Sequence, residues 1–166
     1  MPGPGINPGQ GACLLACIQF QKEIPMTETL QIEGYASLFD VQDLGGDIVR
    51  PGAFAASLLR KGNVPMLFQH EAGEPVGVWD EMIEDRRGLF VRGRLYPDGP
   101  RGRIAQRLLA RGALDGLSIG FRTIKAADMP RGRALHDIDL WEVSLVTFPM
   151  LPQARLRVIS PAARAA

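Results

Sequence analysis

The chain contains 166 residues, with 19 lysines and arginines against 18 aspartates and glutamates, for a formal net charge of +1. This length predicts a single main domain that can bury a hydrophobic core without disulfides. The balanced charge excludes a strongly basic nucleic-acid-binding protein and a protein with an acidic tail.

The first 25 residues differ in composition from the rest. They open with MPGPGINPGQG, whose glycines and prolines disfavour regular structure. The short apolar stretch that follows contains both cysteines, Cys13 and Cys17, and is too short to span a membrane. We therefore expect a disordered leader over residues 1–25, a folded domain over residues 26–160 and a loose tail over residues 161–166. The absence of cysteines from the domain fits a reducing cytoplasm. Because its two histidines are also far apart in the sequence, we expect no metal site, and we expect no cofactor.

The first part of the domain is predicted to contain two extended segments and a helix. Residues 30–39 alternate apolar and polar side chains, which predicts a strand with a bulge at Gly34. A turn and a short extended segment follow at residues 43–49. Pro51 suits the first turn of a helix that ends at Gly62. The side chains expected on the core face of this helix are Phe54, Leu58 and Leu59.

Three strands and a second helix are predicted in the middle of the chain. The strands are expected at residues 64–70, 75–83 and 88–96, with a charged turn between the last two. The helix is expected over residues 100–111 and is ended by Gly112. Its expected core-facing side chains are Ile104, Leu108 and Leu109.

Two long strands complete the prediction. Residues 117–125 read as a strand, and residues 134–148 are apolar on both faces near Val143, which predicts a central strand. Many strands with few helices favour a mainly β fold with helices (α+β). We expect a closed β-barrel surrounded by a few helices.

Ser118 lies in the segment GLSIG, which satisfies the G-x-S-x-G pattern of α/β-hydrolases. That pattern requires a strand before the serine and a helix after it. Here a predicted helix and turn come before the serine and a strand continues after it, which argues against a nucleophile elbow. In a strand, Ser118 shares a face with Gly120, while Leu117 and Ile119 point into the core. Ser118 is therefore either a candidate nucleophile or an ordinary serine on the surface of a strand.

Glu142 and His70 are a candidate acid and base that would activate such a hydroxyl. Glu142 shares strand parity with Ile138 and Leu140, which predicts a buried carboxylate that needs a partner. That partner is either His70, at the end of its own apolar strand, or an arginine in an ion pair. His136 is a rival for the third position, but the rise per residue places it roughly 20 Å from Glu142 along the same strand.

Four segments, in this order, resemble the serine-type prohead maturation proteases of tailed phages, which are distantly similar to the herpesvirus capsid proteases, the assemblins. The segments are GDIVRPGAF, LFQH, LDGLSIGF and LWEVSLVTFPMLPQA, and the resemblance spans Leu30 to Val158. It implies a compact β-barrel wrapped by helices and a catalytic triad of His70, Ser118 and Glu142. The third member is a histidine in assemblins, so a His-Ser-His arrangement with His136 is the alternative.

The resemblance also implies a function and partners. The implied activity is that of a serine endopeptidase that cleaves the scaffolding segment of the major capsid protein, and also itself, inside assembling proheads in the cytoplasm. The implied partners are that capsid protein and a second copy of the chain in a homodimer, with no nucleic acid and no membrane. Similar proteins occur in gene transfer agents, which are domesticated phage particles.

Two other functions stay open at this point. One is a catalytically idle capsid-assembly or scaffold-binding module, and the other is a serine esterase that acts on small molecules. The segment PMLPQA lacks the arginine pair that helps assemblins bind the oxyanion. Backbone N–H groups near residues 148–151 are therefore the expected oxyanion donors.

Overall fold

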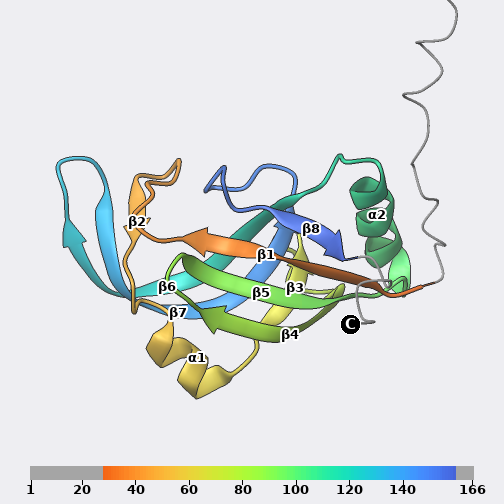
Figure 1. The fold of residues 1–166 in the computed structure, drawn as a ribbon, viewed down its shortest axis with the longest axis horizontal. Coiled ribbons are helices and arrows are strands. Elements are labelled where there is room, and N and C mark those ends of the chain that lie inside the picture. Colours follow the sequence, from red (N-terminus) through yellow and green to blue (C-terminus); the bar gives the residue numbers. More distant parts are fainter. Residues whose placement is uncertain (1–27, 160–166) are drawn as a thin grey trace, which may run out of the picture.

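The fold is an eight-stranded, strongly curled sheet with two helices on its outside (Figure 1). The computed structural model describes residues 28–159. The predicted leader at residues 1–25 and the tail at residues 161–166 lie outside the described residues. The helices are α1 (Ala55–Lys61) and α2 (Gly99–Ala110). The strands are β1 (Leu30–Leu38), β2 (Asp47–Val49), β3 (Pro65–Phe68), β4 (Gly77–Glu84), β5 (Gly88–Leu95), β6 (Gly116–Asp128), β7 (Arg133–Val146) and β8 (Leu156–Ile159).

Strand β7 is an interior strand that is paired along both edges, as its apolar pattern predicts. It pairs antiparallel with β6 along one edge, and its other edge pairs in parallel with β2 at its start and β3 near its end. From β3 the sheet continues through β4, β5, β1 and β8 in antiparallel pairs. As a result, the residues that follow β3 lie at one edge of β7, and the middle of β6 lies at its other edge.

The sheet does not close into the predicted barrel. Near the start of β6, Gly116 forms an isolated bridge with Arg155, and the Leu117 N–H donates to the Ala154 carbonyl at 3.0 Å. Beyond this point β6 and β7 extend together as a hairpin, at the left of Figure 1. Because β8 has only 4 residues and β6 has 13, β8 is too short to pair with the far part of β6 and close the barrel.

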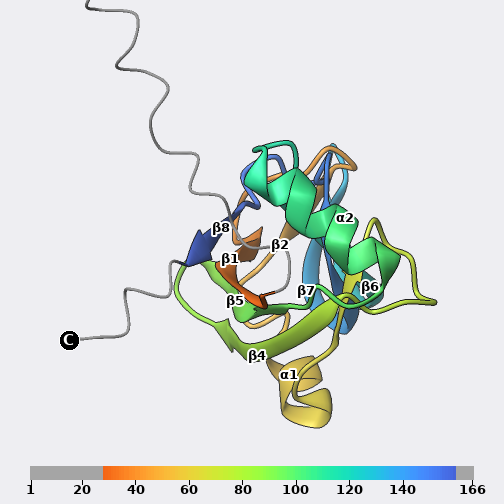
Figure 2. The same cartoon turned by 90° about the vertical axis from the view of Figure 1, so that its right-hand side faces the viewer.

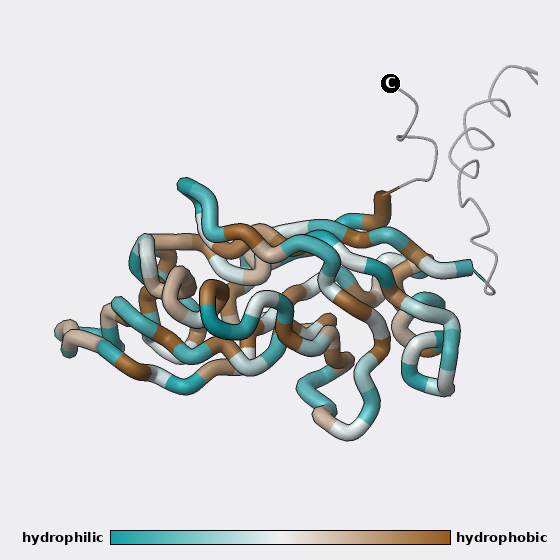
Figure 3. The backbone as a smooth tube through the Cα atoms, turned by 90° about the horizontal axis from the view of Figure 1, so that it is seen from below, coloured by the Kyte–Doolittle hydropathy of each residue, from teal (hydrophilic) through white to brown (hydrophobic). Residues whose placement is uncertain are grey.

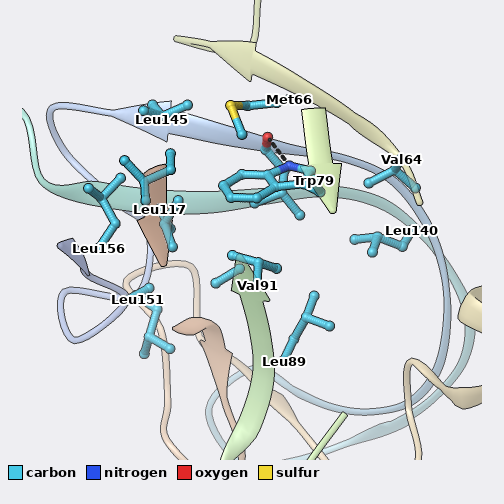
Figure 4. Close-up of a cluster of buried hydrophobic side chains, with 14 of the residues drawn as sticks. Val64, Met66, Trp79, Leu89, Val91, Leu117, Leu140, Leu145, Leu151 and Leu156 are labelled. Atoms are coloured by element: carbon cyan, nitrogen blue, oxygen red, sulfur yellow. Dashed lines mark hydrogen bonds between the residues drawn. The ribbon is translucent and has the colours of Figure 1, made fainter. Parts of the chain in front are cut away.

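Apolar side chains from the strands fill the inside of the curl (Figure 4). Trp79 lies in the middle of this core and is 2 % exposed. Its indole N–H donates to the Val143 carbonyl at 3.3 Å. A buried indole needs such a partner, and each fully buried aliphatic side chain contributes roughly 1.5–3 kcal/mol. Hydrophilic and hydrophobic positions alternate along the chain (Figure 3), as expected where strands have one face on this core.

Both helices lie on the outside of the sheet (Figure 2), and each buries a narrower face than the sequence predicts. Phe54 is fully buried before α1, but Leu59 is 89 % exposed because the short helix turns it away from the sheet. In α2, Ile104 is 46 % exposed. Gly102 sets the phase of α2, since a Cβ there would lie 2.3 Å from the carbonyl oxygen of Tyr96. The side chains that face inward beside it are those of Ala105 and Gln106.

The bulge predicted at Gly34 lies elsewhere in β1. The register with β5 shifts between Tyr35 and Ser37. Gly34 is instead required by a close backbone approach, because a Cβ there would lie 2.2 Å from the carbonyl oxygen of Arg155. Within residues 28–159, no helix is long and apolar enough to cross a membrane.

Candidate active site

His70 lies just beyond the end of β3 and is held against β7 by its backbone. Gln69 and His70 have φ angles of 55° and 61°, which are uncommon for residues other than glycine. The Gln69 N–H donates to the Leu145 carbonyl at 2.9 Å, and its side chain donates to the Thr147 hydroxyl at 2.7 Å. The His70 N–H donates to Oγ of Ser144 at 3.2 Å. This tight turn places the imidazole next to β7 with 46 % of its side chain exposed.

Glu142, on β7, meets the imidazole of His70. Its Oε1 lies 2.6 Å from Nδ1 of His70, and its Oε2 accepts the Ser144 hydroxyl at 2.6 Å. The side chain of Glu142 is only 12 % exposed. Of the two partners that the sequence leaves open for this carboxylate, the structure places His70 there.

The prediction that Glu142 shares a face with Leu140 was wrong. Gly120 lies opposite Glu142, and the next residue, Phe121, lies opposite Leu140, so Trp141 is an extra residue on β7. Because consecutive residues of β6 point to opposite faces, this bulge turns Glu142 away from the core that contains Leu140. The carboxylate is therefore buried by polar neighbours rather than by the hydrophobic core.

Gly120 makes room for this carboxylate. A Cβ built on Gly120 would lie 2.3 Å from Oε1 of Glu142 and 2.8 Å from its Cγ. Any side chain at Gly120 would therefore push Glu142 away from its present position. The sequence singles out this glycine only as a small neighbour of Ser118, and its contact with Glu142 becomes visible only once β6 and β7 are paired.

Ser118 lies on β6 directly opposite Ser144 of β7. Opposed side chains on one face of an antiparallel pair have Cβ atoms about 4.5–5.5 Å apart. Ser118 therefore belongs to the same face as Glu142. It is 6 % exposed, so it is less open than a surface serine. Among the described hydrogen bonds none joins Ser118 to His70, and such catalytic bonds often tighten only when substrate binds.

A cavity of ≈ 200 Å³ lies beside Ser118, between β6 and the second half of β1. Most of its walls are apolar, contributed by Leu38, Val41, Val49, Leu117, Ile119, Phe121 and Leu135. Met150 and Leu151, from the loop after β7, also line it. Its two carboxylates are already engaged: Asp47 pairs with Arg133 at 2.6 Å, and Asp43 accepts the Asp47 N–H at 2.9 Å. The sequence does not predict this cavity, because its walls come from distant segments.

His136 lies apart from this site. It is exposed near the start of β7, where that strand pairs with β6 around Lys125 at the far end of the hairpin. The structure thus brings together His70, Glu142 and Ser118 and leaves His136 outside the group. In the described part of the chain, no three histidine, cysteine or acidic side chains are grouped to hold a metal.

Asp139 forms a second polar cluster on β7, separate from His70. Lys61 lies 2.7 Å from its carboxylate, Arg60 lies 3.1 Å away, and the indole of Trp141 donates to it at 3.0 Å. Hydrogen bonds from Lys61, Trp141 and Arg60 hold the pKa of Asp139 at about 2. Asp139 is thereby a structural anion that joins α1 to β7.

Comparison with known proteins identifies the family of this chain. Residues 19–165 match the family described as caudovirus prohead serine protease. The chain belongs to this family. It is 41 % identical over 127 residues to the prohead protease of Enterobacteria phage HK97, a match that covers 74 % of this chain and 56 % of that protein. The chain thus spans little more than half the length of this curated relative.

Solved structures of two viral proteases show a similar fold. The capsid assembly protease of bacteriophage T4 superposes with a TM-score of 0.58 at 14 % identity, over 72 % of this chain and 82 % of that one. The protease of Kaposi's sarcoma-associated herpesvirus, bound to a hexapeptide phosphonate inhibitor, superposes with a TM-score of 0.56 at 13 % identity, over 81 % and 67 %. At these identities the likeness concerns the fold, and it confirms the assemblin-like architecture apart from barrel closure.

Proposed function

We propose that this prohead protease family member is a serine endopeptidase in which Ser118 is the nucleophile, His70 the general base and Glu142 the residue that orients His70. The observation that carries the proposal is the 2.6 Å contact between Nδ1 of His70 and Glu142. Glu142 lies on β7, the strand that pairs with the strand of Ser118. Family membership supports the reaction class.

The proposed reaction follows from this arrangement. With the Nδ1 proton donated to Glu142, the Nε2 atom of His70 is unprotonated and can accept the Ser118 proton. The Ser118 oxygen attacks the peptide carbonyl and forms a tetrahedral intermediate. Protonated His70 then gives its proton to the leaving amine as the peptide bond breaks. Water, activated by His70 in the same way, hydrolyses the acyl-enzyme and restores Ser118.

The oxyanion donors belong to the same proposal. Within residues 148–151 the candidates are the backbone N–H groups of Phe148, Met150 and Leu151, since Pro149 has no N–H and the segment contains no arginine. Two of its residues, Met150 and Leu151, line the cavity that also contains Ser118. A backbone donor on this loop would stabilise the developing negative charge on the carbonyl oxygen.

The proposed substrate is an extended polypeptide: the scaffolding segment of the major capsid protein and, in a self-cleavage step, the chain itself, inside assembling proheads. The apolar cavity beside Ser118 supports a preference for substrates with an apolar or long side chain next to the cleaved bond. Beyond Leu117, β6 has one paired edge within the described residues, which leaves backbone groups for an added substrate strand. A homodimer is part of the proposal and is tested by sedimentation.

The experiment that tests this function mixes the purified chain with its cognate capsid protein. We expect a new N-terminus at one defined position of the capsid protein, read by intact-mass spectrometry, and no cleavage by Ser118→Ala. Small-ester hydrolysis without capsid cleavage would favour an esterase. Capsid binding with neither reaction would favour an idle assembly module.

A further inference from the structure

A second serine, Ser144, is in contact with both the candidate base and the candidate acid. Ser144 is fully buried, at 0 % exposure, on β7 between two residues that belong to the hydrophobic core. Its hydroxyl donates to Oε2 of Glu142 at 2.6 Å and accepts the backbone N–H of His70 at 3.2 Å. A hydroxyl has one proton to donate and two lone pairs to accept, so both bonds form at once.

We propose that Ser144 is a positioning residue that locks Glu142 and His70 in their reactive geometry; this inference rests on the proposed function. Both oxygens of the carboxylate are then committed, one to Nδ1 of His70 and the other to Ser144. A carboxylate held at both oxygens does not rotate about its terminal bond. It therefore keeps accepting the Nδ1 proton and leaves Nε2 of His70 free to act as a base.

The second bond acts on the backbone of the base. His70 has a φ of 61° and follows Gln69 with a φ of 55°, so two consecutive residues occupy a region that costs free energy for side chains other than glycine. Such a turn persists when surrounding contacts hold it. The Ser144 hydroxyl supplies one of those contacts through the His70 N–H. One atom thus fixes the main chain of the base and the side chain of the acid.

Ser144 is not an alternative nucleophile. Its hydroxyl proton is already engaged in a hydrogen bond to Glu142, and at 0 % exposure the side chain is not accessible to a peptide. Ser118, directly across the strand pair, lines the cavity instead. The two opposed serines therefore have different roles, one toward substrate and one toward Glu142.

The chain offers a matched control in Ser57. It is also buried, at 1 % exposure, and its hydroxyl also accepts a backbone N–H from β7, that of Leu140 at 2.9 Å. Ser57→Ala and Ser144→Ala therefore remove the same atom and leave the same kind of amide without its partner. Ser144→Ala alone also removes a contact with Glu142.

The test measures capsid-protein cleavage and the NMR signal of the His70 Nδ1 proton in the full chain. We expect Ser144→Ala to lower kcat by about 10-fold to 100-fold with little change in KM, and to broaden or shift the Nδ1 proton signal. Ser57→Ala should change neither quantity, and Ser144→Thr, which keeps the hydroxyl, should recover part of kcat.

Two results would overturn the inference: kcat for Ser144→Ala equal to that of Ser57→Ala, or a Nδ1 proton signal unaffected by the loss of the hydroxyl. If Ser144→Ala fails to fold, Ser144→Cys, which keeps a weaker donor, is measured in the same two ways. Failure of the proposed function is recognised separately, because Ser118→Ala would then cleave normally, while the NMR comparison would still report on the contact between Ser144 and Glu142.

Discussion

The carboxylate of Glu142 lies 2.6 Å from Nδ1 of His70, although 72 positions separate the two residues in the chain. The parallel pairing of β3 with β7 brings them together, since Met66 lies opposite Val143 and Phe68 lies opposite Leu145. The tight turn after Phe68 then folds His70 back beside β7. The positions of His70 and Glu142 are thus set by one strand pairing, and Ser118 lies at the opposite edge of β7, on β6.

Ser118→Ala is expected to abolish capsid-protein cleavage without loss of the fold. The change removes one hydroxyl oxygen from a residue for which the structure records no side-chain hydrogen bond. The midpoint of thermal unfolding should therefore stay close to that of the parent chain. Cleavage is followed by gel electrophoresis of the capsid protein, and processing at the parent rate would exclude Ser118 as the nucleophile.

Glu142→Gln is expected to lower the turnover rate by about 10²–10⁴-fold, because an amide in place of the carboxylate disturbs the tautomer of His70. His136→Ala should be nearly silent, since His136 is exposed at the far end of the hairpin. Both variants are compared by kcat on the same peptide substrate. An inactive His136→Ala together with an active Glu142→Gln would instead support a Ser-His-His arrangement.

Much of the fold can be predicted from the sequence. Seven of the eight strands, both helices and the interior position of β7 follow from apolar periodicity and from glycine and proline stops, but the short strand β8 was not predicted. The barrel closure was wrong, and the helix faces were right only in part: Phe54 is buried and Leu58, Leu108 and Leu109 pack against the core, whereas two predicted core-facing residues do not. Leu59 and Ile104 are exposed because the phase of a short helix depends on one close contact, such as that of Gly102 with Tyr96, and not on the number of its apolar residues.

Gly120→Ala is expected to reduce turnover by about 10²-fold or more while the chain stays folded. A methyl group there would lie 2.3 Å from Oε1 of Glu142, and a displacement of about 1 Å in a catalytic group has an effect of this size. Gly73→Ala is the matched control, because a Cβ at Gly73 meets nothing within 4 Å. Steady-state kinetics on a peptide measures both variants, and equal turnover in the two would show that Glu142 need not occupy this position.

Asp139 is expected to stabilise the fold above about pH 4 and to lose that effect as the pH falls toward 2. Its pKa in the folded protein is about 2, held down mainly by Lys61, against about 3.9 in an unfolded chain. The unfolded state therefore takes up the proton first as the pH falls, which favours unfolding. Below both pKa values the contribution is gone.

Urea unfolding of Asp139→Asn measures this effect. The variant should unfold at a lower urea concentration than the parent chain at pH 6, and the difference should shrink below pH 4 and be mostly lost near pH 2. Asp137→Asn, two positions away and outside the Lys61 cluster, is the control. A difference between Asp139→Asn and the parent that stays constant from pH 6 to pH 2 would contradict the assignment of this carboxylate as an anion in the folded state.

The candidate site is predicted only in part by the sequence. Residue types and motif order point to His70, Ser118 and Glu142, but the face of Glu142 depends on the extra residue Trp141, and no local signal marks that bulge. The contacts of Ser144 depend on the turn at His70. That turn has a left-handed backbone but no glycine, so the sequence contains no signal that predicts it. Both features arise from strand pairing between distant segments.

The central claim is that Ser118 is a nucleophile activated by His70 and Glu142. Labelling the full chain with a fluorophosphonate and mapping the adduct by peptide mass spectrometry tests this most directly. We expect a single adduct on the peptide that contains Ser118, formed far more slowly in His70→Ala and at the parent rate in Ser57→Ala. An adduct on another residue, or labelling of Ser118 at an unchanged rate in His70→Ala, would contradict the account.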